Sequence, residues 1–128
     1  MKLLLDTHTL LWWDGVPTRL STKALKLLQD PSSRLYISIA TLWELQIKVQ
    51  LGKLQLRVPL NQIVQEQQRD NRVQMLLVKP AHIYALDGLP LHHRDPFDRM
   101  LIAQAQTEKA VLVSQDAVFS QYPVSVIW

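Results

Sequence analysis

The sequence contains no cysteine. A disulfide framework and a thiolate metal site are therefore excluded, and any bound metal must be held by oxygen or imidazole ligands. Long hydrophobic runs are missing from the amino terminus as well. In MKLLLDTHTLLWWD only three leucines precede the first aspartate, which is too short a run for a signal peptide or a membrane span. We expect a cytoplasmic protein that makes no membrane contact.

The chain also lacks low-complexity linkers and internal repeats. Its 128 residues, 48% of them hydrophobic, suffice for one compact domain with a real core, so residues 1–128 are predicted to form a single domain. The 14 Lys and Arg residues exceed the 11 acidic residues and give a net charge of +3. This mildly basic balance favours a polyanionic partner but does not identify one.

Strand-like and helix-like segments alternate along the chain. Strand-like runs occupy residues 2–5, 35–39, 74–78 and 111–114, and residues 124–127 are a fifth candidate. Ser21 can cap a helix that runs to about residue 29, Pro59 opens another through about residue 69, and a short helix follows Pro80. Three of the strands are apolar at successive positions, which is typical of a parallel sheet covered by helices. The predicted class is α/β, with a central, mainly parallel sheet of about four to five strands flanked by helices.

Two aspartates stand where predicted strands end. Asp6 follows the first run directly, and Asp116 comes two residues after the fourth. Ligands bind at the carboxyl edge of open α/β sheets, so both side chains can reach one rim. The alternative is that each aspartate only caps the helix or turn that follows it.

Glu44 lies in SIATLWELQIKVQLGKL, a helical segment whose apolar residues cover most of its circumference. The carboxylate is therefore expected to be half buried and to need a cation, a hydrogen-bond network or a proton. Two local alternatives remain open, since Thr41 stands at capping-box spacing and Lys48 is an ordinary ion-pair partner four residues on.

The segment HHRDPFDRMLIAQAQ contains two further aspartates. Asp95 before Pro96 is a strong helix start, and its role is expected to be structural. Asp98 heads the apolar stripe of the same helix and should face inward. Its alternative role is that of a first-turn acid favoured by the helix dipole.

Four carboxylates can therefore meet in a compact α/β fold: Asp6, Glu44, Asp98 and Asp116. They would form an all-oxygen site, which suits Mg²⁺ or Mn²⁺. If a metal neutralises these four acids, seven acidic residues remain against 14 basic ones. The rest of the surface then favours phosphate.

Four motifs, DTHTLLWW, SxxTLWELxxKxxLGKL, HRDPFDRMLIAQA and LVSQDxxF, resemble in order and spacing the successive motifs of VapC-type PIN domains, across nearly the whole chain. The resemblance implies a Rossmann-like three-layer sandwich and a homodimer. It also implies a metal-dependent endoribonuclease that is the toxin of a type II toxin–antitoxin pair and is silenced by a small VapB-type antitoxin.

By the same resemblance, a metal-activated water hydrolyses an RNA phosphodiester, with transfer RNA or another structured RNA as the leading candidate. The four acids divide between metal binding and the orientation or deprotonation of the water, and Asp6 and Asp98 are the strongest ligand candidates. The hydroxyl groups of Thr7 and Ser114 are expected to support the carboxylates through hydrogen bonds.

Four basic residues bracket the start of the Asp95 helix: His92, His93, Arg94 and Arg99. They are candidates for RNA phosphate contacts, although solvation of a charged surface explains them equally well. His8 is expected to be a hydrogen-bonded structural residue. Trp12 and Trp13 are expected in the core or in a dimer contact rather than in base stacking.

Other classes with an aspartate at a strand end fit less well. A phosphoaspartate phosphatase needs a second aspartate two positions after the first, where this chain has His8, and a receiver domain pairs adjacent acids near its first strand. The remaining alternatives are a PIN-domain ribonuclease outside a toxin–antitoxin pair and a non-catalytic RNA-binding module.

Overall fold

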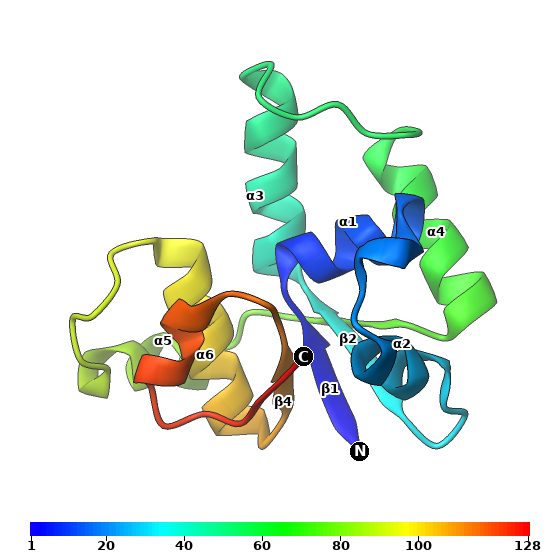
Figure 1. Cartoon of the computed structure of the whole chain (residues 1–128). Coiled ribbons are helices and arrows are strands. Elements are labelled where there is room, and N and C mark those ends of the chain that lie inside the picture. Colours follow the sequence, from blue (N-terminus) through cyan, green and yellow to red (C-terminus); the bar gives the residue numbers. More distant parts are fainter.

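The computed structural model describes all 128 residues, which fold around one five-stranded sheet (Figure 1). The strands are β1 (Lys2–Leu5), β2 (Arg34–Ser38), β3 (Gln74–Leu76), β4 (Val111–Val113) and β5 (Val126–Ile127). They lie in the order β3-β2-β1-β4-β5, and all neighbouring pairs are parallel. The predicted α/β class with a parallel sheet is confirmed.

Six α-helices connect the strands: α1 (Thr7–Gly15), α2 (Thr22–Gln29), α3 (Ile39–Gln50), α4 (Leu60–Asn71), α5 (Pro80–Ala85) and α6 (Pro96–Glu108). Three 3₁₀ turns complete the chain: η1 (Pro17–Arg19), η2 (Leu86–Gly88) and η3 (Ala117–Gln121). None of the helices combines the length and the apolar character that crossing a membrane requires.

The central strand β1 contributes to two separate cores. Successive side chains of a strand point to opposite faces of the sheet. Leu3 and Leu5 accordingly join one apolar cluster with residues of α1, α2, β2 and α3, while Leu4 joins a second with residues of α6, β4 and η3. Figure 1 shows the result, with α1 and α2 on one side of the sheet and α5 and α6 on the other. The predicted three-layer sandwich is confirmed.

Capping residues explain where several helices begin and where one strand ends. Ser21 caps α2 as predicted, its hydroxyl accepting from the Ala24 amide at 3.0 Å. Helix α1 was not among the predicted helices, although the Asp6 carboxylate caps it. Strand β2 stops at Ser38 rather than at residue 39, because the Ser38 hydroxyl caps α3. The expected strand of residues 74–78 ends at Leu76, and the fifth strand begins only at Val126.

The carboxyl edge of the sheet gathers chain segments that are distant in sequence. Because all strands are parallel, their carboxyl ends meet at this edge. Asp6 and Ser114 directly follow the two neighbouring strands β1 and β4. Helix α3 starts immediately after β2 at the same edge and packs against α6. This arrangement brings the helices that carry Glu44 and Asp98 to the ends of the central strands.

Candidate active site

Asp6 occupies the junction between β1 and α1, and the residue is only 6% exposed to solvent. One carboxylate oxygen accepts from the Thr9 backbone amide at 2.8 Å, and the other accepts from the Ser114 hydroxyl at 2.5 Å. Asp6 forms no ion pair with a basic side chain. The fold therefore holds this nearly buried carboxylate rigidly through neutral donors alone.

The Ser114 hydroxyl links two of the predicted site aspartates. It donates to Asp6 and accepts from the backbone amide of Asp116 at 3.0 Å. The Asp116 carboxylate is exposed and accepts from the Val118 amide at 3.0 Å, so it also caps η3. The capping role that the sequence left open is thus present for both Asp6 and Asp116, and their role in a metal site stays a prediction.

Glu44 is more deeply buried than its sequence suggested, with 5% exposure. Its Oε1 atom accepts from the Thr7 hydroxyl at 2.5 Å, and its Oε2 atom accepts from the Lys48 ammonium group at 3.0 Å. The local ion pair that the sequence left open is present. Among the site acids, Glu44 thus has a lysine counter-ion of its own, and the predicted supporting hydroxyl of Thr7 supports this residue.

Asp98 lies in the first turn of α6, behind the Asp95 cap. The Asp95 carboxylate accepts from the amides of Phe97 and Asp98 at 2.8 and 3.1 Å, which confirms the predicted helix cap. The Asp98 side chain is 22% exposed, and its Oδ2 atom lies 2.7 Å from His93 Nε2. Burial raises the pKa of Asp98 to about 6, and the charges of Asp95 and Glu44 add to this rise while His93 opposes it. The surroundings of Asp98 therefore disfavour its charged form, because they offer too little positive charge to offset its burial.

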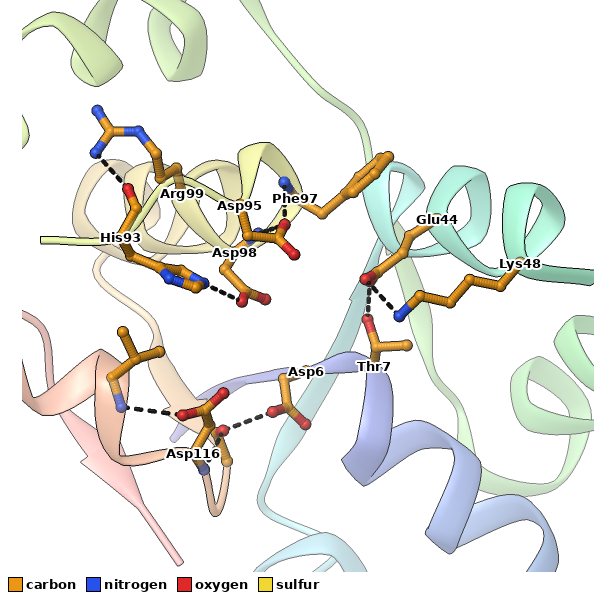
Figure 2. A network of polar contacts seen from close by, with 12 residues as sticks. Asp6, Thr7, Glu44, Lys48, His93, Asp95, Phe97, Asp98, Arg99 and Asp116 are labelled. Carbon is orange, nitrogen blue, oxygen red and sulfur yellow. Dashed lines mark hydrogen bonds and ion pairs between the residues drawn. The ribbon is translucent and has the colours of Figure 1, made fainter. Parts of the chain in front are cut away.

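The four predicted acids all lie at the carboxyl edge of the sheet. Figure 2 shows the carboxylates of Asp6, Glu44 and Asp98 around a common space, with that of Asp116 beside Asp6. No three of these four acids have ligand atoms within 4.8 Å of one another; the one group that meets this distance is His93 with Asp95 and Asp98. His93 was absent from the predicted ligand set, because its approach depends on how the loop before α6 folds back.

The donor set fits a hard divalent cation. Burying a carboxylate without compensating charge is costly, and Asp6 and Asp98 both lack a lysine or arginine partner. Carboxylate oxygens are the ligands that Mg²⁺ and Mn²⁺ prefer, and a hydroxyl-bonded Asp6 retains lone pairs for such an ion. A cation shared by these two residues would balance the charge that the protein leaves uncompensated.

Comparison with known proteins places the chain in a family. Residues 3–124 match the sequence profile of the PIN domain. The chain belongs to the PIN-domain family. It is 28% identical over 115 residues to Ribonuclease VapC22 of Mycobacterium tuberculosis, which covers 89% of this chain and 86% of that protein.

Two solved structures share the fold of this PIN domain. VapBC2 from Rickettsia felis, bound to a DNA fragment from their promoter, has a TM-score of 0.76 at 18% identity and covers 99% of this chain and 98% of that chain. VapBC-1 from nontypeable Haemophilus influenzae has a TM-score of 0.65 at 21% identity, with coverages of 99% and 97%. At these identities the likeness concerns the fold.

The four basic residues before and within α6 have unequal surroundings in this PIN domain. Arg99 donates to the backbone carbonyl of Pro90 at 2.9 Å and, at 3.4 Å, to those of His93 and Leu86. Its guanidinium group therefore holds the loop that presents His93 to Asp98. Arg94 and His92 are exposed, and their proposed phosphate contacts stay a prediction.

His8 differs from its expected role as a hydrogen-bonded structural residue. It is exposed, its ring forms no hydrogen bond, and it stacks on Trp12 one helical turn away. Both Trp12 and Trp13 are partly buried and pack against the core cluster of β1 and α2. The spacing of His8 and Trp12 on a helix capped by Asp6 is the sequence signal that could have revealed this stack.

Proposed function

We propose that this PIN domain is a metal-dependent endoribonuclease of the VapC type and acts as the toxin of a toxin–antitoxin pair. The observation that carries the proposal is the gathering of Asp6, Glu44, Asp98 and Asp116 at the carboxyl edge of the sheet, with Asp6 and Asp98 short of positive charge. The similarity to Ribonuclease VapC22 supports the reaction class. The fold shared with two VapBC complexes supports a small VapB-type antitoxin as partner.

In this proposal Asp6 and Asp98 hold Mg²⁺ or Mn²⁺, and Asp116 holds a second ion or orients a bound water. When bound, such an ion polarises the phosphate and acidifies the attacking water. Ser114 and the Thr9 amide keep Asp6 in place, so binding requires little rearrangement of its side chain.

In this proposal Glu44 orients the attacking water or accepts its proton. Thr7 and Lys48 fix both of its carboxylate oxygens, and the Lys48 charge balances its own. A carboxylate held in this way can receive a hydrogen bond from water without moving. Arg94 and His92 are then available on the exposed loop for RNA phosphates.

The proposal extends to the setting of the reaction. We place the protein in the cytoplasm as a homodimer, and we propose transfer RNA or another structured RNA as its substrate. The net charge of +3 supports an RNA partner, because the acids concentrated at the site leave a basic excess elsewhere.

The decisive experiment compares RNA cleavage by the purified protein with Mg²⁺, with Mn²⁺ and with EDTA. We expect cleavage only with a divalent ion, and we expect Asp6→Asn to abolish it while Asp87→Asn, at an exposed turn, leaves it intact. Undiminished cleavage by Asp6→Asn would contradict the site. RNA binding without any cleavage would favour a non-catalytic RNA-binding module.

Expression in a bacterial host tests the toxin role separately. We expect growth arrest that co-expression of a neighbouring small open reading frame relieves. Metal-dependent cleavage in vitro without arrest would favour a PIN-domain ribonuclease outside a toxin–antitoxin pair.

A further inference from the structure

An open depression of about 440 Å³ adjoins the acid cluster, and its aromatic wall has no role in the hydrolysis described above. It is lined by Asp6, His8, Trp12, Gln115, Asp116 and Ala117. Two of these residues are acids of the proposed metal site. A ligand in the depression would therefore lie directly beside a phosphate held at the acid cluster.

One wall of the depression is aromatic. The exposed ring of His8 stacks on the Trp12 ring, with centroids 5.6 Å apart and planes inclined by 15°. The two residues are one turn apart on α1, so the helix itself holds the pair in register. Trp12 is anchored in turn by Trp128, whose ring centroid lies 5.6 Å away, and by the core beneath α1. The outer ring is thus a solvent-facing surface with a rigid support.

Positive charge and hydrogen-bonding groups accompany the rings. The guanidinium carbon of the exposed Arg19 lies 6.0 Å from the centroid of the Trp12 ring, although Arg19 lines a neighbouring depression that shares Trp12 rather than this one. Gln115, an exposed residue in the lining, offers both an amide donor and a carbonyl acceptor. An aromatic stack beside a cation is the arrangement with which proteins bind single-stranded nucleic acid, because the ring takes the base and the cation takes the backbone.

The same features disfavour an apolar protein partner. An apolar surface placed over the depression would bury the carboxylate of Asp116 and the amide of Gln115 without partners, which costs free energy. A nucleobase instead presents hydrogen-bonding edges around an apolar face. The chemistry of the lining matches a base.

We propose that His8 and Trp12 form a stacking platform for an unpaired nucleobase next to the phosphodiester held by the acid cluster, with Gln115 at the edge of the base. This inference rests on the proposed nuclease function and narrows its substrate. A base within a continuous duplex is stacked on its neighbours and is not free for the platform, so the RNA must be single-stranded or looped at the cleavage site.

Binding measurements test the platform without any cleavage. The probes are a labelled octameric oligoadenylate and an abasic ribose-phosphate oligomer of equal length, titrated by fluorescence anisotropy in EDTA at low salt. Both probes carry the same phosphates, so the ratio of their dissociation constants isolates the base. We expect the native chain to prefer the oligoadenylate by roughly 5- to 150-fold, the range of base stacking on aromatic side chains.

Two substitutions should lower this ratio toward one. His8→Ala removes the exposed ring, and Trp12→Phe reduces the supporting ring while preserving its packing. Tyr84→Ala is the matched control, because Tyr84 is a 74% exposed aromatic residue on α5 outside the depression, and it should leave the ratio unchanged. Circular dichroism of each variant confirms that the fold is intact.

Several outcomes overturn the platform. It fails if the native chain shows no preference for the oligoadenylate, or if both His8→Ala and Trp12→Phe keep the native ratio. It also fails if these substitutions only convert a dimer to a monomer in sedimentation, which would assign the rings to a contact between copies. Cleavage with Mg²⁺ is scored separately. If the protein cuts RNA but His8→Ala leaves the ratio of the two dissociation constants unchanged, the platform alone is refuted. If binding depends on the base but no RNA is cut, the nuclease function alone is refuted.

Discussion

Helix α6 carries an acidic residue near each end, and the pKa values of these two residues are shifted in opposite directions. Asp98 in the first turn has a pKa raised to about 6, mainly by burial. Glu108 at the last position has a lowered pKa, mainly because of its hydrogen bond with His82. The helix dipole alone would favour the reverse, since it stabilises negative charge at the amino end and destabilises it at the carboxyl end. Tertiary surroundings therefore outweigh the dipole at both ends.

The partners of the two carboxylates explain the contrast. Glu108 lies 2.8 Å from His82 Nε2, 3.7 Å from Lys2 Nζ and 4.0 Å from Lys79 Nζ. Asp98 has only His93 nearby, and its other charged neighbours are acids. Glu108 at the amino edge of the sheet thus has three basic partners, whereas Asp6 and Asp98 at the carboxyl edge have no lysine or arginine partner. A charge imbalance of this kind is typical of binding and catalytic sites, and it supports the proposed metal site.

Exchanging one carboxylate for an amide at each end of α6 should give the largest difference. We expect Asp98→Asn to lower the rate of RNA cleavage by roughly a hundredfold or more, because loss of a metal ligand costs at least as much as loss of its supporting residues. Glu108→Gln should leave the cleavage rate within about threefold of that of the native chain. Initial rates with saturating Mg²⁺ measure both, and equal losses would refute the division between a functional and a structural end.

The amino edge should matter for stability instead. His82 is fully buried, its Nδ1 atom accepts from the Lys79 amide at 3.0 Å, and its Nε2 atom bonds to Glu108. His82→Ala leaves a cavity and an unpaired amide, and we expect it to lower the free energy of unfolding by roughly 2–4 kcal/mol. Urea denaturation measures this loss, and Tyr84→Ala on the same helix provides an exposed control. A change no larger than that of the control would show that the network at the amino edge is dispensable.

The smallest effect is a pH dependence at the carboxyl edge. Because the pKa of Asp98 in the folded protein is about 6 and its ordinary value is 3.8, the folded state binds this proton more tightly. The contribution of Asp98 to the free energy of unfolding therefore falls as pH rises from about 4 to about 6. In EDTA at pH 7 we expect Asp98→Asn to be more stable than the native chain by roughly 1–2 kcal/mol, after allowing for solvent screening.

Thermal unfolding at a series of pH values measures the contribution of Asp98 to the stability. The difference in stability between Asp98→Asn and the native chain should vanish well below pH 3.8, where Asp98 is protonated in both the folded and the unfolded state. Added Mg²⁺ should reverse the order at pH 7, because only the native chain keeps the full ligand set. A difference that is constant with pH would contradict the raised pKa of Asp98.

Much of the fold and part of the site could be predicted because the determining interactions are local. Apolar runs specified the strands, Ser21 and Asp95 specified helix starts, and the pairing of Glu44 with Lys48 follows from their spacing on a helix. Helix α1 was missed because its apolar residues gave no clear stripe, and only the Asp6 cap marked its start.

The sequence by itself determined the α/β class, the main elements and the placement of acids at strand ends, since each depends on residues within about one turn or one strand. Only the tertiary structure decided which charges are balanced: His93 turned toward Asp98, Arg99 bound to loop carbonyls, and Glu108 surrounded by Lys2, Lys79 and His82. The physical reason is that Coulomb and desolvation energies depend on distance and burial in space, and these are set by how loops and helices pack across the sheet.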